Sequence, residues 1–460
     1  MNKLKKSNIK SGRARDRAWW QKPGLGIMYQ IEARPGWWWN RNYDEFNASL
    51  KDKRGNLDFN GPFCQMKEWV AFSRNVGVDY HIFEAKWHDG ICYFDTQYTN
   101  WKTPVDYCRI FAEESRNAGI PFMFYYSSIF DHNPQFDDIQ PLRSSTPSFL
   151  AMHREKKDEV VDYSVKFTRR ILESARARVP RDIPLNDFTY DPEKYEKYLL
   201  NQVAELITNY RPDGMWMDWF MGSVESSAEL VMDFIKKEYP NVVLTFNNSS
   251  NAQLKWAHYT TGEAHTVKSS WEQGNMYRLK IAPWELVGPA ARGWDNPSSR
   301  TDPYEAARIA VIIMASGGKF SFGLPSQMDG ALYPEPAQHV AVTGDWYRPR
   351  RRLFTEALPM QYEEEGVPGI HLGEEGFGTI GSIYKDHNLI HIINFSGTRK
   401  TLSARLSHES WPGLNQVILE PEGKEIPLHK KADATDFTIS GDDIDPVDTI
   451  IRVGRTGQGV

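Results

Sequence analysis

The chain has 460 residues, of which 40% are hydrophobic and 25% charged, and its formal net charge is −5. This balance is typical of a soluble globular protein and indicates neither a nucleic-acid nor an anionic-membrane partner. We find no uninterrupted apolar run of membrane-spanning length. The three cysteines, Cys64, Cys92 and Cys108, are scattered, which argues against a disulfide framework and a CxxC metal site.

Residues 1–19 are rich in lysine and arginine and predict a basic, flexible tail. No apolar segment of the kind found in signal peptides follows this tail. The compartment stays open on this basis: the protein is periplasmic or secreted if a signal peptide has been removed, and otherwise cytoplasmic.

Repeated segments of the strand and helix type begin near residue 20. GLGIMYQIE predicts a first strand, GVDYHIFEAK and IPFMFYYSS predict later ones, and KFSFGLP predicts the last. TPVDYCRIFAEESRNAG predicts a helix with Thr103 as N-cap and Gly119 just past its end. In the strand GVDYHIFEAK and the residues that follow it, side chains alternate between the two faces, so Glu84, Lys86 and His88 share one face. We expect Glu84 and Lys86 to form a buried ion pair there.

The stretch around 195–248 shows the same order clearly. YEKYLLNQVAELITNY predicts an amphipathic helix, RPDG ends it, and MWMDW predicts a short buried strand. SSAELVMDFIKKEYP predicts a second helix, with Ser226 and Glu229 at capping-box spacing, before the strand NVVLTFNN. Such alternation over residues 20–358 favours a closed (β/α)8 barrel. The absence of GxGxxG after an early strand weakens the dinucleotide-binding alternative.

After residue 358 the pattern changes to short strands separated by turn residues. GTIGSIYK, NLIHIINFSG, NQVILEP, DFTIS and DTIIRVG are of this type. We therefore expect an all-β sandwich domain over residues 359–460.

Asp218 is the one carboxylate in the apolar run RPDGMWMDWF. A buried charge is costly unless it is paired or used, so Asp218 is either a capping or ion-paired residue or part of a site. In a (β/α)8 barrel the active site lies at the C-terminal ends of the strands. Other polar residues at predicted strand ends are His88, Asp89, Tyr126, Ser127, Asn247, Asn248, Glu263 and Glu285.

These residue types suit hydrolysis of a glycosidic bond, which needs two carboxyl groups across the scissile bond. An apolar wall keeps one of the two protonated near neutral pH. The chain has 16 Trp, 21 Tyr and 23 Phe, which can supply that wall and stack on sugar rings. GxSxG and HExxH are absent, which argues against serine-hydrolase and zinc-protease chemistry.

Several motifs together resemble the α-L-fucosidases of glycoside hydrolase family 29, over about residues 20–350. AKWHDG is similar to the family's AKHHDG motif, and WMDW is similar to the strand that carries its nucleophilic aspartate. GIMYQIE falls where the family has its first strand, and FGLPSQMDG followed by VTGDWYR is similar to its closing stretch. The resemblance implies a barrel, a C-terminal β-sandwich and a retaining exo-α-glycosidase that needs no metal or other cofactor.

The resemblance also implies roles for single residues. Asp218 corresponds to the nucleophile, and Glu263 in YTTGE is our choice for the acid/base, with Glu272 in SSWEQG and Glu285 in PWE as rivals. The residues expected to bind the sugar are Gln30, Trp87, His88, Tyr126, Trp216 and Trp294.

Two positions depart from the family. Gln30 occupies the position of the family's first-strand histidine. Trp87 occupies the position of the first histidine in the family's HHD motif. Both family histidines contact fucose hydroxyls, so we expect a fucose-like sugar, such as an O-methylated or sulfated fucose. Two alternatives stay open: an exo-glycosidase for a sugar of the galactose or arabinose series, and a non-catalytic carbohydrate-binding protein. Linkage, aglycone and oligomeric state are not specified.

Overall fold

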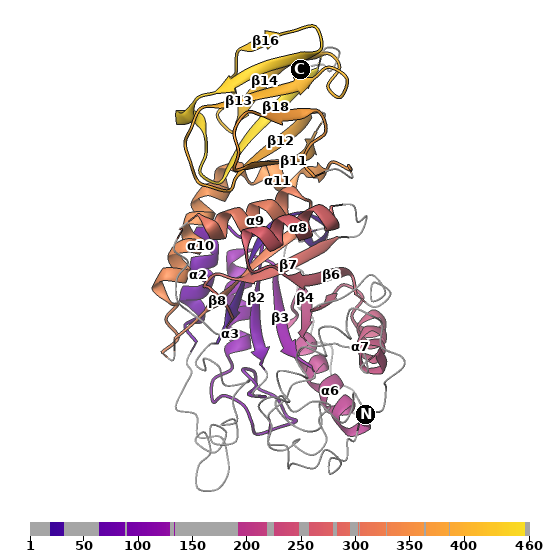
Figure 1. Cartoon of the computed structure of the whole chain (residues 1–460). Coiled ribbons are helices and arrows are strands. Elements are labelled where there is room, and N and C mark those ends of the chain that lie inside the picture. The colour runs from indigo at the N-terminus through magenta and orange to yellow at the C-terminus, as the bar shows by residue number, and fades with distance from the viewer. Residues whose placement is uncertain are drawn as a thin grey trace, which may run out of the picture.

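A computed structural model shows a barrel followed by a β-sandwich (Figure 1). It describes residues 19–31, 64–87, 90–128, 133, 192–218, 225–247, 257–278, 283–294, 302, 304–327, 329–362, 365–385 and 387–455. The predicted basic tail lies outside the described residues, apart from Trp19. In the described part of the chain, no helix is both long and apolar enough to span a membrane.

Eight parallel strands form the closed barrel in chain order, which confirms the predicted fold class. They are β1 (Gly24–Gln30), β2 (Tyr80–Lys86), β3 (Phe122–Ser127), β4 (Gly214–Asp218), β5 (Val243–Phe246), β6 (Tyr259–Glu263), β7 (Trp284–Pro289) and β8 (Lys319–Pro325). The sheet closes where β1 pairs with β8 along its whole length, from Gly24↔Lys319 to Gln30↔Pro325. The strands are buried on both faces, as expected for parallel sheets.

Helices cover the outside of the barrel. They are α2 (Met66–Val76), α3 (Tyr107–Ala118), α6 (Pro192–Tyr210), α7 (Glu225–Glu238), α8 (Val267–Tyr277), α9 (Glu305–Ala315) and α10 (Pro334–Tyr347). Buried apolar side chains of strands and helices form one large cluster between the two layers. A second, smaller cluster fills the inside of the barrel.

Helix boundaries differ from two predictions. Asp106, not Thr103, is the N-cap of α3, because its side chain accepts a hydrogen bond from the backbone N–H of Arg109. Gly119 does end this helix, with a φ of 71° that favours glycine. Helix α7 already begins at Glu225, so Ser226 lies inside it and is not its N-cap.

The end of β2 also departs from prediction. The register with β3 shifts between Glu84 and Lys86, so the alternation of faces is broken there. Glu84 accepts a hydrogen bond from the backbone N–H of Ile31 at 2.9 Å. The ammonium group of Lys86 instead lies 4.2 Å from the centre of the Tyr126 ring. The prediction that Glu84 and Lys86 share one face is therefore wrong.

The C-terminal domain has two antiparallel sheets, consistent with the predicted sandwich. The six-stranded sheet contains β15 (Lys424–Glu425), β14 (Leu414–Glu420), β18 (Asp448–Arg455), β12 (His387–Asn394), β11 (Phe377–Tyr384) and β9 (Ala357–Pro359). The four-stranded sheet contains β10 (Ile370–Leu372), β13 (Leu402–Ser407), β17 (Ala434–Ile439) and β16 (Leu428–Lys430). A separate apolar cluster lies between them.

Polar contacts tie the two domains together. Arg308 on α9 is only 3% exposed. Its Nε and Nη2 donate hydrogen bonds to the backbone carbonyl of Pro446 at 3.0 and 2.8 Å. It also forms an ion pair with Asp302. On α8, the indole N–H of Trp271 donates to Glu365 at 2.7 Å. The contact surface therefore includes the helix that follows β6.

Replacing Arg308 should weaken the whole fold. Arg308→Met leaves the Pro446 carbonyl and the Asp302 carboxylate without this donor, so we expect a loss of about 2–4 kcal/mol in the free energy of unfolding. Urea denaturation measures it. Lys268→Ala, which removes an exposed ion pair with Glu272, is the control and should cost less than about 0.5 kcal/mol. Equal losses in the two variants would contradict the interface assignment.

Candidate active site

The N-terminal end of the barrel is closed by aromatic rings. Trp19 and Trp20 precede β1 and pack on Tyr80 and Tyr259, with ring centres 5.4 and 6.4 Å apart respectively. The ammonium group of Lys319 donates to the carbonyl of Trp20 at 2.7 Å. This end therefore offers no room for a substrate among the described residues.

Glu285 lies just above this floor, at the second position of β7. It accepts hydrogen bonds from the hydroxyl of Tyr80 and from the indole N–H of Trp216. Burial raises the pKa of Glu285 above its usual range, against the opposing charge of Lys319. Burial also lowers the pKa of Lys319 to about 8, although Glu285 acts in the other direction. Glu285 thus belongs to the packed interior of the barrel.

Asp218 is the last residue of β4 and is 5% exposed. Its Oδ1 accepts a hydrogen bond from the side-chain amide of Asn247 at 2.8 Å. Its Oδ2 accepts one from the hydroxyl of Tyr125. Burial, reinforced by the charge of Asp218, raises the pKa of Tyr125 well above its usual value, so the phenol stays a donor. Donors from both neighbouring strand ends thus fix the orientation of this carboxylate.

Glu263 is the last residue of β6. Its Oε1 accepts a hydrogen bond from Asn247 at 3.1 Å, and its Oε2 accepts one from the indole N–H of Trp294 at 3.1 Å. Nε2 of His265 lies 3.0 Å from the same Oε2. Burial acts to raise the pKa of Glu263, but the His265 contact and charge and the other hydrogen bonds outweigh it and leave the pKa below its usual value.

One amide group connects the two carboxylates. Asn247 Nδ2 lies 2.8 Å from Asp218 Oδ1 and 3.1 Å from Glu263 Oε1. An amide nitrogen has two N–H groups, so it can donate to both at once. The two oxygens can therefore be no more than about 6 Å apart, which is close to the roughly 5–5.5 Å typical of retaining glycosidases.

An aromatic and a polar side chain meet beside this pair, over β8. A Cβ atom at Gly323 would lie 2.2 Å from the ring of Trp294 and 2.9 Å from Oε1 of Gln30. The Trp294 ring therefore needs a glycine at this position, whereas the end of the Gln30 side chain would only have to shift. Trp87, just after β2, and Trp294 both pack against the cluster inside the barrel.

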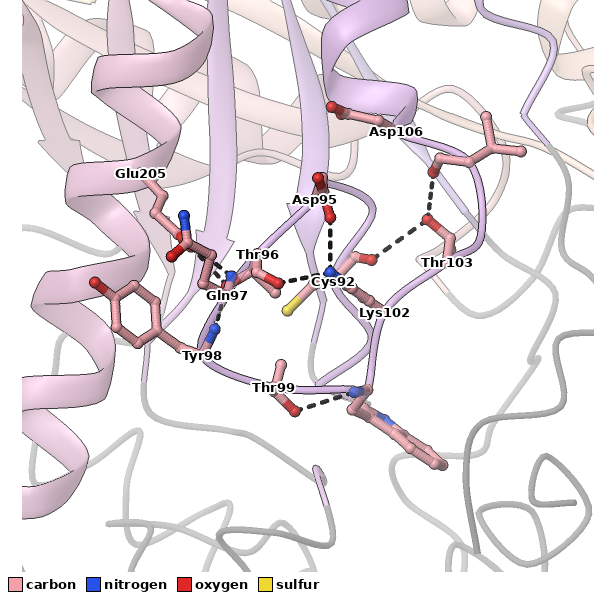
Figure 2. A network of polar contacts seen from close by, with 12 residues as sticks. Cys92, Asp95, Thr96, Gln97, Tyr98, Thr99, Lys102, Thr103, Asp106 and Glu205 are labelled. Carbon is pink, nitrogen blue, oxygen red and sulfur yellow. Dashed lines mark hydrogen bonds and ion pairs between the residues drawn. The ribbon is translucent and has the colours of Figure 1, made fainter. Parts of the chain in front are cut away.

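The segment after Trp87 is anchored to α6 (Figure 2). Glu205 accepts hydrogen bonds from the hydroxyl of Thr96 at 2.6 Å and from the backbone N–H of Gln97 at 3.0 Å. Lys102 donates to Asp95 at 2.6 Å within the same loop. These contacts hold the residues that follow the WHDG motif in one position.

Comparisons with known proteins show the family of the chain and support its fold. The model of the family described as Alpha-L-fucosidase matches residues 17–350. The chain belongs to the α-L-fucosidase family. The structure is similar to α-L-fucosidase isoenzyme 1 from Paenibacillus thiaminolyticus, at 18% identity and a TM-score of 0.68, covering 96% of this chain and 99% of that one. It is also similar to the Thermotoga maritima α-fucosidase, at 16% identity and a TM-score of 0.64, covering 95% and 96%. Comparison with curated protein sequences gives no match.

Membership of this family makes the protein a glycoside hydrolase with a carbohydrate substrate. The structure brings four of the predicted site residues together, at or just after the C-terminal ends of β4, β6, β7 and β1: Asp218, Glu263, Trp294 and Gln30. Among the described residues, no group of three or more His, Cys, Asp or Glu side chains is arranged to hold a metal ion. His88 lies outside the described residues.

Tyr126 is one of the predicted sugar-binding residues that the structure does not support. Its side chain is fully buried, and its hydroxyl donates to Gln202 of α6 at 2.6 Å, so it points out of the barrel. The neighbouring Tyr125 points inward and reaches Asp218. Alternation along β3 allows only one of two adjacent tyrosines to face the site. That residue is Tyr125, whereas the sequence analysis predicts Tyr126.

Trp216 and the two rival glutamates also lie elsewhere. Trp216 is 1% exposed and stacks on Tyr125, with ring centres 5.3 Å apart, so it supports that tyrosine from below and does not line a pocket. Glu272 is exposed on α8 and lies 3.8 Å from Lys268. Glu285 is enclosed at the opposite end of the barrel. Neither rival is placed to face Asp218 in the way that Glu263 does.

Two further residues of the site, Asn247 and His265, were not among the predicted site residues. Asn247 follows β5, and the pattern LTFNN did indicate a polar strand end. His265 follows Glu263 by two residues in TTGEAH, and a histidine so close to a candidate acid/base was a usable signal.

The two adjacent tyrosines give a matched test of the site. Tyr125→Phe removes a donor to Asp218, so we expect hydrolysis of an aryl α-L-fucoside to slow about tenfold to a hundredfold. Tyr126→Phe removes the hydrogen bond to Gln202, outside the barrel, so we expect an unchanged rate and a loss of about 1 kcal/mol in stability. Steady-state kinetics and urea denaturation measure the two effects. A larger rate effect for Tyr126→Phe would contradict the orientation of β3.

Proposed function

We propose that this protein is a retaining exo-α-glycosidase that removes a terminal fucose, or a fucose-like sugar, from oligosaccharides or polysaccharides. The observation that carries the proposal is the bridge made by Asn247 between Asp218 and Glu263. A carboxyl separation of about 5–5.5 Å leaves no room for a water between the carboxylate and the sugar, and so favours direct attack.

In this mechanism Asp218 attacks the anomeric carbon while Glu263 gives a proton to the departing oxygen. A covalent glycosyl-enzyme forms, and Glu263 then removes a proton from the water that releases the sugar. Tyr125 and Asn247 hold the Asp218 carboxylate, because each donates to one of its oxygens. Trp294 both contacts Glu263 and supplies an aromatic face beside the site.

The sugar is proposed to carry a substituent where the family binds free hydroxyls. Gln30 and Trp87 replace two histidines that contact fucose hydroxyls in the family. Tryptophan offers mainly an apolar face and a single N–H donor. A methyl ether or a sulfate ester replaces the free hydroxyl at that position of the sugar. A free hydroxyl buried there without a hydrogen-bond partner would cost about 1–3 kcal/mol.

Asp218→Asn should abolish turnover and leave the fold intact, because the amide is a poor nucleophile. Glu272→Gln is the matched control, since it removes an exposed carboxylate and should keep the wild-type rate. Proton NMR of the sugar released by the wild type, recorded before mutarotation, should show the α anomer first. Release of the β anomer first would mean inversion, and full activity of Asp218→Asn would exclude the nucleophile role.

The choice of sugar can be tested by restoring the family residues. Wild type is expected to favour 4-nitrophenyl fucosides that carry one O-methyl or O-sulfate group over the unsubstituted fucoside. The double variant Gln30→His with Trp87→His should shift this ratio toward the unsubstituted fucoside by about tenfold or more, because donors to free hydroxyls return. A panel that includes galactosides and arabinosides checks the wider range. A ratio that does not change would show that these positions do not select the substituent.

A further inference from the structure

We propose that Gly288 on β7 and Gln273 on α8 are positioning residues, which hold the backbone of Glu263 where its acid/base role needs it. Neither residue faces the sugar: Gly288 acts by having no Cβ atom, and Gln273 acts through a hydrogen bond from the helix layer. The proposal rests on the proposed function, which assigns the acid/base role to Glu263, and adds two residues away from the reacting groups on which proton transfer depends.

The segment that follows Glu263 lies unusually close to β7. A Cβ atom at Gly288 would lie 2.1 Å from the carbonyl oxygen of Ala264 and 3.3 Å from its carbonyl carbon. Both are backbone atoms, so no side-chain rotation could relieve the overlap. Ala264 is 1% exposed, and its N–H donates to the carbonyl of Val287 at 2.9 Å. The absence of a Cβ atom at Gly288 is therefore what lets the two segments meet here.

The sequence of β7 explains this close approach. In a parallel ladder, the carbonyl of Ala264 would accept from the N–H of residue 289, because the N–H of Ala264 donates to residue 287. Residue 289 is a proline and has no N–H. The carbonyl instead faces the Cα hydrogens of Gly288, where a weak Cα–H···O contact can form. Gly-Pro at the end of β7 thus replaces a ladder hydrogen bond with close packing.

A second contact reaches the same backbone from the helix layer. The side-chain amide of Gln273, in the middle of α8, donates to the carbonyl of Glu263 at 2.8 Å. The start of α8 is fixed to this segment as well, because Thr266 caps the helix and the backbone N–H of His265 donates to Ser269 at 3.2 Å. The main chain at Glu263 is thus held from two sides, by β7 and by α8.

The carboxylate of Glu263 depends on this backbone position. It accepts hydrogen bonds from Asn247 after β5 and from Trp294 after β7, both at 3.1 Å. The Trp294 ring is itself seated against Gly323, so it does not move freely with the glutamate. Ordinary contact between nonbonded atoms begins near about 3.5 Å, so the methyl group of an alanine on β7 must displace Ala264 by about 1 Å. A misplacement of that size can cost about a hundredfold in rate.

The added methyl group would not reach the sugar or the nucleophile. Leu286 and Phe320 lie on the same side of the sheet as the missing Cβ atom of Gly288, and both belong to the apolar layer between strands and helices. Asp218 lies on β4 and keeps its hydrogen bond from Tyr125. Gly288→Ala should therefore weaken proton transfer and spare the attack by Asp218.

The kinetic test compares Gly288→Ala with the wild type on two glycosides of the sugar that the wild type hydrolyses best. For the methyl glycoside, whose departing oxygen needs a proton, kcat/KM should fall about tenfold to a hundredfold. For the 2,4-dinitrophenyl glycoside, whose phenolate leaves without a proton, kcat/KM should stay within about threefold. Added azide attacks the glycosyl-enzyme without needing a base, so it should raise kcat of the variant on the second glycoside and form the glycosyl azide.

A second variant and a control accompany this test. Gln273→Ala loosens the same backbone without adding an atom, so kcat/KM on the methyl glycoside alone should fall about twofold to tenfold. This variant decides the proposal if Gly288→Ala does not fold. Gly373→Ala in the sandwich is the control, because its Cβ atom would meet Ser403 at an ordinary 3.4 Å, and it should change neither rate.

An equal loss on both glycosides overturns the proposal, because general damage to the barrel predicts that result, and so does a folded variant that loses no rate. A crystal structure of Gly288→Ala tests the geometry without substrate. The carbonyl of Ala264 should move away from β7 by about 1 Å, and an unmoved carbonyl overturns the proposal. Failure of the proposed function is recognised separately, since the wild type would then hydrolyse neither glycoside.

Discussion

Closure of the sheet between β1 and β8 is the constraint on which the rest of the structure depends. Once the eight strands form a ring, every second side chain points into a space from which water is excluded. Polar groups there must find partners inside the barrel, since an unpaired buried charge is costly. Glu285 and Lys319 meet this requirement at one end, and Asp218, Asn247 and Glu263 meet it at the other.

The two ends meet the requirement in different ways. At the closed end, carboxylate and ammonium groups are enclosed by aromatic rings, and their environment favours their neutral forms. At the open end, Glu263 receives three donors from separate elements and remains a carboxylate. The two glutamates therefore differ in the direction of their pKa shifts: burial dominates at Glu285, whereas the contacts with His265, Asn247 and Trp294 outweigh burial at Glu263.

The sequence was sufficient for the overall architecture, because strand and helix patterns and turn residues are local properties. It also located Asp218 and Glu263 at strand ends. The sequence did not predict which face of a strand each of two adjacent similar residues occupies. FMFYYSS does not reveal which tyrosine faces inward, and only the pairing of Ser127 with Asp218 of β4 fixes it. Glu285 was misplaced because β7 begins at Trp284, so the glutamate enters the barrel at the closed end. The bulge in β2 likewise depends on pairing with β3.

The contact between α8 and the C-terminal domain has a wider consequence. Trp271 of this helix binds Glu365 and meets Phe395 edge to face, while Arg278 just after the helix donates to the carbonyl of Tyr362. The first turn of the same helix fixes His265. The sandwich thus supports α8, the helix that follows the strand carrying Glu263, from the outside of the barrel. Shortening the protein to the barrel alone would take these partners from Trp271 and Arg278 and loosen the helix whose first turn holds His265 beside Glu263.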